Sequence, residues 1–169
     1  MYVFQYGSNC DSERLNSADR LNGLAKSLGK ACTVEDFELE FDVYSTTNQC
    51  AASDMIRCPG SGNKVWGVLY DVPEDHVVAA RTDGSKTLAQ IEGPLYRPER
   101  IMVEWQRTQV EVITFLVRNP VQTLTTSPDY VAHIIHGLRA HNVDQDYIES
   151  VRRKAITNDP QREDSYRAL

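Results

Sequence analysis

The clearest periodic pattern in the chain is a strict alternation of apolar and acidic side chains from Phe37 to Val43. Successive side chains of a β-strand point to opposite faces, so this alternation predicts a strand with one buried face. Apolar, aromatic and β-branched runs predict further strands at residues 2–6, 65–72, 101–107 and 110–118, with a weaker candidate at 51–57. The runs on either side of a turn near Thr108 are expected to pair with each other.

Helices are predicted where polar capping residues or proline precede a mixed segment. The expected helices cover residues 12–15 after Asp11, 74–81 after Pro73, 88–91 before Gly93-Pro94, 128–140 after Ser127, and 144–151 from Asp144. Residues 16–29 are rich in Asn, Gly and Ser, and are expected to be loop with some helix. This gives about six strands, with helices inserted between them and at the end.

The order of these elements lacks the steady strand–helix alternation of a doubly wound parallel sheet. It favours an α+β fold with a curled, largely antiparallel sheet. Residues 1–156 are expected to form a single domain. Residues 157–169 are polar and contain Pro160, so they are expected to form a loose C-terminal tail.

Charge and composition limit the function. The 169 residues include 18 Lys and Arg against 24 Asp and Glu, a formal net charge of -6. A nucleic-acid partner requires a basic face, so none is expected. The chain lacks both an apolar stretch of 18 residues and a signal-peptide pattern, which predicts a cytoplasmic location without a membrane partner. Homodimer formation is left open.

Four cysteines, at positions 10, 32, 50 and 58, lack any Cys-x-x-Cys spacing. Free thiols are therefore predicted, with a Cys50–Cys58 disulfide as the alternative. A thiol at Cys10 could act as a nucleophile if it lay at a helix N-terminus, although a small buried side chain is the simpler interpretation.

The segment Tyr6-Gly7-Ser8-Asn9 follows a buried strand and precedes a predicted helix. A glycine here lets the backbone turn, so that successive N–H groups point at one anion. An ordinary strand-to-helix turn is the alternative. The segment lacks the Gly-x-Gly-x-x-Gly fingerprint, and the chain has no phosphate-binding P-loop, so no nucleotide cofactor is expected.

Glu92 stands between Ile91 and the chain reversal at Gly93-Pro94, where it could line the floor of a cleft. Partial burial would raise its pKa toward the range of a general base. A solvated glutamate at a helix end is the alternative. His133 and His136 share one face of a predicted helix, but no third ligand stands at a metal-site spacing, so no metal is expected.

Four segments together resemble the γ-glutamylcyclotransferase-like superfamily, which also includes γ-glutamylamine cyclotransferases and plant avirulence-induced proteins. They are the strand ending in Tyr6-Gly7-Ser8-Asn9, the strand Val65-Trp66-Gly67-Val68-Leu69-Tyr70, the segment Ile91-Glu92-Gly93-Pro94-Leu95-Tyr96, and Ser127-Pro128-Asp129-Tyr130 with the helical residues that follow. The resemblance runs from Val3 to about Val151.

The resemblance implies a small, mixed, largely antiparallel β-barrel flanked by helices. It implies that the backbone of Val3–Ser8 holds the carboxylate of a γ-glutamyl group and that Glu92 is the catalytic acid/base. Tyr130 matches a substrate-contacting tyrosine, and Tyr96 matches a tyrosine near the site. The full set of implied substrate-binding residues is Val3, Phe4, Gln5, Tyr6, Gly7, Ser8, Asn9, Tyr96 and Tyr130.

The implied activity is cyclisation of a γ-glutamyl group to 5-oxoproline with release of an amine or amino acid. The substrate's own α-amine is the nucleophile, so the reaction requires no metal and no cofactor. One glutamate can take and return the proton. Two alternatives stay open: an inactive member of the fold that binds a small molecule or a protein, and a hydrolase that uses Cys10.

Overall fold

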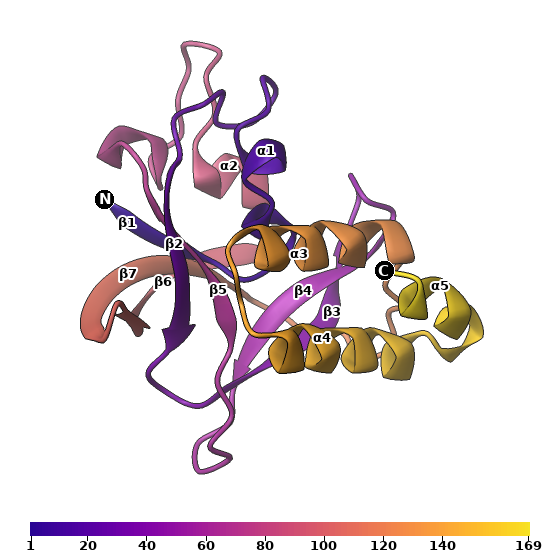
Figure 1. Ribbon diagram of the computed structural model, residues 1–169. Helices are drawn as coiled ribbons and strands as arrows, with labels where there is room; N and C mark the ends of the chain where they lie inside the picture. Colours follow the sequence, from indigo (N-terminus) through magenta and orange to yellow (C-terminus); the bar gives the residue numbers. More distant parts are fainter.

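Five strands close into a barrel in the order β1-β5-β2-β6-β7 (Figure 1). The computed structural model describes residues 1–169. The barrel strands are β1 (Tyr2–Gln5), β2 (Lys26–Thr33), β5 (Trp66–Asp71), β6 (Tyr96–Trp105) and β7 (Thr108–Val117). All neighbours are antiparallel except β1 and β7, whose parallel pairing closes the barrel at Val3 and Ile113. The predicted α+β fold with a mixed, largely antiparallel barrel is confirmed.

Two further strands, β3 (Phe37–Ser45) and β4 (Cys50–Arg57), form a separate antiparallel hairpin. The alternation that predicted β3 is visible in its burial, because Phe37, Leu39 and Phe41 are buried while Glu38 and Glu40 are half-buried. The register shifts between Phe41 and Val43, so Asp42 is an extra residue in the ladder. Such a bulge bends the strand locally.

Two long helices, α3 (Pro128–Ala140) and α4 (Gln145–Asn158), run side by side next to the β3–β4 hairpin (Figure 1). Ser127 caps α3 by accepting a hydrogen bond from the Tyr130 N–H, as its sequence predicts. Short helices complete the chain: α1 (Ser12–Leu15), α2 (Leu88–Glu92), α5 (Glu163–Arg167), and the 3-10 turns η1 (Ser8–Cys10), η2 (Glu74–His76) and η3 (Pro160–Arg162).

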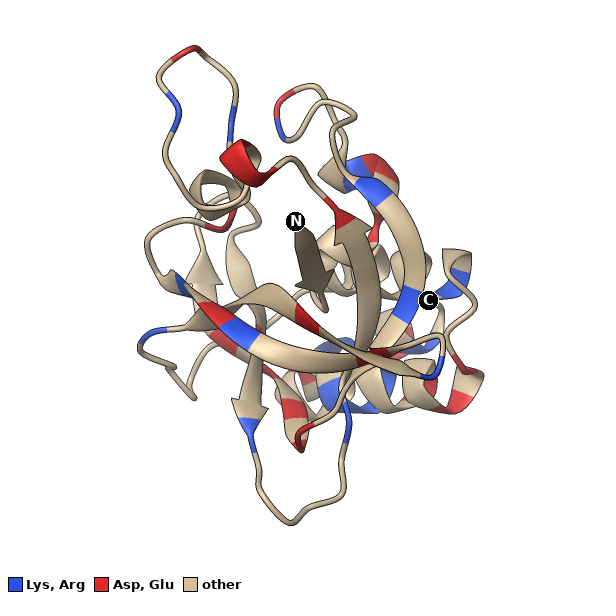
Figure 2. Ribbon diagram, turned by 90° about the vertical axis from the view of Figure 1, so that its left-hand side faces the viewer, with Lys and Arg blue, Asp and Glu red and all other residues tan.

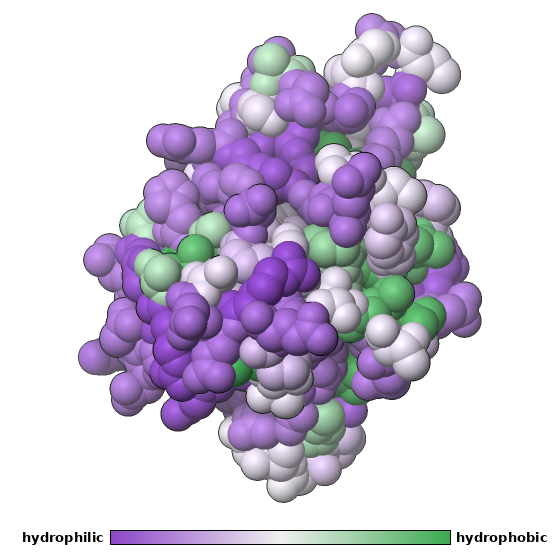
Figure 3. All heavy atoms as spheres, turned by 90° about the vertical axis from the view of Figure 1, so that its right-hand side faces the viewer, coloured by the Kyte–Doolittle hydropathy of each residue, from purple (hydrophilic) through white to green (hydrophobic).

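The barrel and the helices share one apolar core that includes Phe4, Leu69, Tyr70 and Ile134. Gly67 lets β5 lie close to β1, because a Cβ at this position would stand 2.2 Å from the Gln5 carbonyl oxygen. No helix has both the length and the apolar character needed to cross a membrane. Basic and acidic residues are interspersed along the ribbon in Figure 2, and hydrophilic residues cover most of the face in Figure 3.

Two elements differ from the sequence prediction. Strand β2 lies partly in the segment expected to be loop, because its exposed Lys26 and Ser27 and its Gly29 hide the strand pattern. Pairing with β5 and β6 on its two sides stabilises it. The helix expected at 74–81 is only the single turn η2. The acidic residues after Pro73 correctly predicted where a helical turn begins. The segment that follows has no apolar face, so the helix does not continue.

The end of the chain is helical, and the expectation of a loose tail from residue 157 is wrong. Helix α4 continues to Asn158, and η3 and α5 follow it. Tyr166 is fully buried, and its hydroxyl donates to Asp159 Oδ2 at 3.0 Å. Arg152 Nε also donates to the Tyr166 carbonyl oxygen at 3.1 Å. One buried aromatic side chain therefore anchors a segment that is polar elsewhere.

Candidate active site

Strand β1 runs into a tight turn that carries Gly7, Ser8 and Asn9 into η1. The turn is closed by a hydrogen bond from the Cys10 N–H to the Gly7 carbonyl oxygen at 2.9 Å. A Cβ on Gly7 would stand 2.2 Å from Ser53 Oγ and 3.3 Å from the Tyr130 hydroxyl oxygen. Glycine is therefore required here because β4 and α3 pack directly against the turn.

Glu92 is the last residue of α2, and its carboxyl faces this turn. A capping box between Thr87 and Gln90 fixes the start of α2, and Gly93, at φ 86°, ends it in a left-handed conformation. Asn9 Nδ2 donates to Glu92 Oε1 at 2.9 Å. Arg20 Nη1 in turn donates to Asn9 Oδ1 at 2.6 Å, so the three side chains form a hydrogen-bonded chain that we call the relay.

The environment of Glu92 raises the pKa of its carboxyl. Burial has the largest effect, because it penalises the charged form. The hydrogen bond from Asn9 and the charge of Arg20 oppose this effect without cancelling it. Glu92 is thus a half-buried acid whose direct partner is a neutral amide and not a cation. Such a group loses its proton at a higher pH than an ordinary glutamate does.

Three tyrosine hydroxyls surround the turn, and each is bonded to protein atoms. The Tyr130 hydroxyl accepts from the Ser53 N–H at 3.0 Å and shares a hydrogen bond with Ser53 Oγ at 2.9 Å. Tyr96 donates to the Ser53 carbonyl oxygen at 2.7 Å, and Tyr6 donates to the Phe115 carbonyl oxygen at 2.5 Å. Burial raises the pKa of all three phenols, so they are neutral donors.

The structure brings most of the sequence-predicted site residues together. One narrow pocket is lined by Gln5, Tyr6, Gly7, Ser8, Asn9, Ser53, Glu92, Tyr96, Phe115 and Tyr130. It adjoins a cavity of about 310 Å³ between the β3–β4 hairpin and the residues that follow α2. This second space shares Ser8, Asn9, Glu92, Tyr96 and Tyr130 with the first. We call it the Glu92 cavity.

Two implied binding residues lie elsewhere. Val3 and Phe4 are fully buried in the barrel and line neither the narrow pocket nor the Glu92 cavity. Their backbone belongs to the β1 ladder, where Val3 pairs with Tyr70 and Phe4 with Leu69. Their role is therefore to hold the strand from which the turn leaves.

Three residues of the site were not predicted from the sequence: Ser53, Phe115 and Arg20. Ser53 lies on the weakest of the predicted strands, and Phe115 reads as an ordinary member of an apolar strand. Arg20 lies in a loop without any periodic pattern. Their hydrogen bonds at the site join residues 11 to 109 positions apart, so no local signal reports them.

The thiol and the histidines considered in the sequence have other roles. Cys10 is buried and donates to the Gln5 carbonyl oxygen at 3.1 Å, and burial raises the pKa of its thiol, which disfavours a nucleophilic thiolate. His133 Nδ1 and His136 Nδ1 both approach Asp11 Oδ2, at 2.9 and 3.4 Å. Asp11 is also the N-cap of α1. All four cysteines are free thiols.

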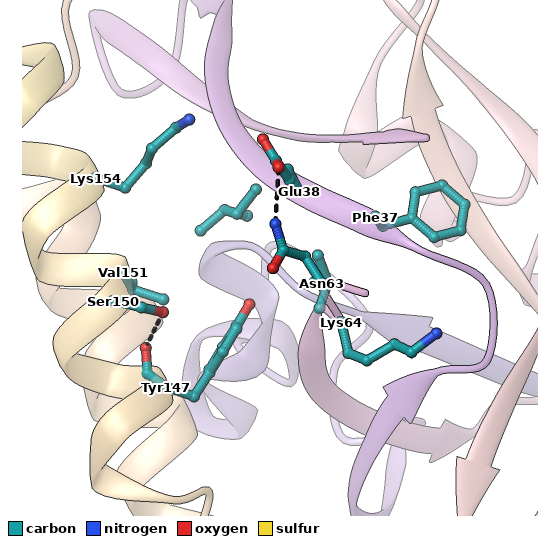
Figure 4. A pocket seen from close by; sticks show the side chains of 10 residues that line it. Phe37, Glu38, Asn63, Lys64, Tyr147, Ser150, Val151 and Lys154 are labelled. Carbon is teal, nitrogen blue, oxygen red and sulfur yellow. Dashed lines mark hydrogen bonds between the residues drawn. The ribbon is translucent and has the colours of Figure 1, made fainter. Parts of the chain in front are cut away.

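A second cavity, of about 330 Å³, lies between β3 and α4 (Figure 4). Both of its lysines are paired with carboxylates. Lys154 contacts Glu40, and Lys64 Nζ donates to Asp36 Oδ1 at 2.7 Å. Asn63 donates to Glu38 Oε1 at 2.8 Å (Figure 4). We call this space the β3–α4 cavity; it contains none of the predicted site residues.

Solved structures share this fold. One described as "Gamma-glutamyl cyclotransferase" has a TM-score of 0.73 at 21% identity, covering 90% of this chain and 86% of its own. An uncharacterized protein from Homo sapiens has a TM-score of 0.72 at 22% identity, covering 89% and 85%. YkqA from Bacillus subtilis has a TM-score of 0.74 at 21% identity, covering 94% of this chain and 55% of its own. At these identities the similarity shows the fold alone.

Comparison with curated proteins finds no match. The family described as "Gamma-glutamyl cyclotransferase, AIG2-like" matches residues 3–132, which is most of the chain. The matched range includes the turn at Gly7, the whole of α2 with Glu92, and Tyr130 at the start of α3. The chain therefore belongs to the gamma-glutamyl cyclotransferase, AIG2-like family, a family of gamma-glutamyl cyclotransferase-like enzymes.

Proposed function

We propose that this protein converts a γ-glutamyl group to 5-oxoproline and releases an amine or amino acid, with Glu92 as the acid/base. The observation that carries the proposal is the Glu92 carboxyl. It is half-buried, bonded to a neutral amide, and placed at the junction of the narrow pocket with the Glu92 cavity.

The proposed reaction is an intramolecular acyl transfer. The substrate's α-amine attacks its own γ-carbonyl carbon, a new C–N bond closes the ring, and the original amide C–N bond breaks. Glu92 takes the proton that the attacking ammonium must lose and returns it to the leaving nitrogen. The substrate brings nucleophile and electrophile together, so the protein has only to hold the folded conformation.

The turn at Gly7–Asn9 is suited to hold negative charge. The Gly7 N–H has no acceptor among the protein atoms, and it lies beside the narrow pocket. A free backbone N–H can bind a carboxylate or the oxyanion that develops during attack. The Gln5 side chain lines the same pocket beside the Glu92 carboxyl, whose pKa it lowers, and its buried Nε2 has no hydrogen-bond partner at normal distance, so it is a second donor next to the acid/base.

The test is production of 5-oxoproline by the purified protein from a panel of γ-glutamyl compounds. We expect 5-oxoproline and free amine in equal amounts, with activity retained after treatment with a thiol-blocking reagent. Binding without any 5-oxoproline would identify an inactive member of the fold. Loss of activity on thiol blocking alone would point to Cys10 chemistry instead.

A further inference from the structure

Few charged side chains line the Glu92 cavity, and none of them forms an ion pair. Of the 18 residues that line it, only Glu92 and Arg20 carry charged side chains. The wall formed by the β3–β4 hairpin offers neutral hydroxyl and amide groups, from Ser45, Thr46, Thr47 and Asn48. Arg20 is therefore the single cation available to a ligand in this cavity.

Arg20 has no carboxylate partner. Its side-chain hydrogen bond goes to the neutral Asn9 amide, and burial together with the nearby charge of Arg14 lowers the pKa of its guanidinium. Arg14 also lacks an ion pair, because it contacts Asn48 Oδ1 at 2.9 Å and His133 Nε2 at 3.4 Å. Its Nε is buried without a partner. Both arginines line a further hollow that also contains Asp11, Glu13 and Asp19, but none of these carboxylates forms an ion pair with either guanidinium. Two neighbouring like charges without ion partners favour an anion beside them.

We propose that Arg20 binds a carboxylate carried by the leaving group, so that the substrates are γ-glutamyl amino acids or peptides and not γ-glutamyl amines. Arg14, which is hydrogen-bonded to Asn48 in the cavity wall, adds to the positive potential in the cavity. This inference rests on the proposed function of the same site and adds the class of leaving group to it.

The geometry of the relay supports a carboxylate close to the broken bond. Asn9 contacts Glu92 and Arg20 at once, so the acid/base and the guanidinium are separated by one amide side chain. In a γ-glutamyl amino acid a single carbon separates the leaving nitrogen from its carboxylate. A diamine or polyamine would instead bring a second cation toward Arg20 and Arg14, which Coulomb repulsion opposes.

The experiment compares γ-glutamyl-L-alanine with γ-glutamyl-L-alaninamide, which has nearly the same shape but no carboxylate charge. Wild type, Arg20→Gln and the control Arg153→Gln are assayed with both, with thermal unfolding as a check of the fold. Arg153 is exposed on α4 and forms no ion pair. We expect wild type to prefer the carboxylate by about 10-fold to 100-fold in kcat/KM, mainly through KM, as for a hydrogen bond to a charged group.

Arg20→Gln should bring that ratio close to one, while Arg153→Gln should keep it. A ratio near one in wild type, or an unchanged ratio in Arg20→Gln, would overturn the inference and leave the proposed function standing. The same two ligands are also titrated calorimetrically into Glu92→Gln and into Glu92→Gln with Arg20→Gln. A preference for the carboxylate that depends on Arg20, without any 5-oxoproline from wild type, would support the inference and reject the proposed function.

Discussion

The Glu92 cavity and the β3–α4 cavity have nearly equal volumes, about 310 and 330 Å³, but they differ in whether their cations are paired with carboxylates. In the β3–α4 cavity each lysine contacts a carboxylate, so no cation is free, while Glu38 is bonded to the neutral Asn63 amide. In the Glu92 cavity the carboxyl and the guanidinium both bond to the neutral Asn9. Partly buried charges without ion partners, as in the Glu92 cavity, lower the stability of the fold unless a ligand pairs with them.

Ion pairs at a surface contribute little to the free energy of folding, and their charges are already neutralised and cannot bind a substrate. An unpaired, half-buried carboxyl keeps its lone pairs and an altered pKa, both of which catalysis requires. Volume alone does not separate these two cavities. Charge pairing distinguishes the two, and substitutions in each can test whether that distinction is functional.

The largest effect is expected from Glu92→Gln. Glutamine keeps the shape but cannot take a proton, so kcat should fall by roughly 10²-fold to 10⁴-fold. The matched substitution in the other cavity is Glu38→Gln, which should leave kcat unchanged. Initial rates of 5-oxoproline release measure both. Activity of Glu92→Gln within about three-fold of wild type would assign the base to another residue.

The pH dependence of the wild-type rate also tests whether Glu92 is the base. Burial raises the pKa of Glu92, and the base must be the carboxylate form. The rate should therefore fall on the acidic side, as pH drops through this raised pKa. The acidic limb should begin at a higher pH than the pKa of an ordinary glutamate, and Glu38→Gln should not move it.

Asp42 is an unpaired carboxyl outside both cavities, so an unpaired carboxyl does not by itself mark a binding site. It is 1% exposed, and neither carboxyl oxygen has a hydrogen-bond partner. Burial, followed by the nearby charge of Asp54, raises the pKa of Asp42 to about 7. A raised folded-state pKa of an acid means that stability present at low pH is lost as pH rises, here between about 4 and 7.

Asp42→Asn removes this titration. We expect the free energy of unfolding to increase by roughly 1–4 kcal/mol at pH 8 and to stay unchanged at pH 4. Urea unfolding at both pH values measures the difference, with Glu104→Gln, exposed on β6, as the control. Equal effects of Asp42→Asn at the two pH values would show that its carboxyl does not titrate in this range. Unchanged turnover in Asp42→Asn would place the residue outside the proposed chemistry.

The sequence was informative where function and local pattern coincide. The alternation at 37–43, the apolar run at 65–72 and the caps at Asp11 and Ser127 each predicted an element that the structure contains. Gly7 and Glu92 were both marked by glycine-dependent chain reversals, which are visible in a short window of residues.

What the sequence could not predict depends on contacts between distant segments. Strand β2 is polar and is defined by its neighbours, and Tyr166 is a single anchor in a polar segment. The sequence indicated that Gly7 lets the backbone turn, but not that Ser53 Oγ lies 2.2 Å from where a Cβ would stand. No residue near Gly7 in the chain reports that a serine 46 positions later lies there.

That contact predicts coupling between Gly7 and Ser53. A Cβ 2.2 Å from Ser53 Oγ must displace the serine, so Gly7→Ala should lower the free energy of unfolding by about 1–3 kcal/mol. Ser53→Ala removes the Oγ, leaving the Ser53 Cβ at 3.5 Å, an ordinary contact. The double variant should therefore be more stable than the sum of the single changes predicts. Strict additivity in urea unfolding would contradict the packing described for this turn.

The smallest effect concerns two tyrosines, one in each cavity. The Tyr130 hydroxyl is bonded to the Ser53 N–H and Oγ, so Tyr130→Phe leaves the Ser53 N–H without its acceptor. The free energy of unfolding should fall by about 0.5–1.5 kcal/mol. The Tyr147 hydroxyl in the β3–α4 cavity is buried without a partner, so Tyr147→Phe should be neutral or slightly stabilising.

Kinetics of the same pair test whether Tyr130 also contacts substrate. If its phenol donates to the γ-glutamyl group, kcat/KM of Tyr130→Phe should fall by roughly 3-fold to 10-fold, the range of one neutral hydrogen bond, while Tyr147→Phe keeps the wild-type value. A loss of stability with unchanged kcat/KM would mean that the hydroxyl serves only Ser53. Tyr130 would then be a positioning residue that holds the β4 wall of the site against the turn at Gly7.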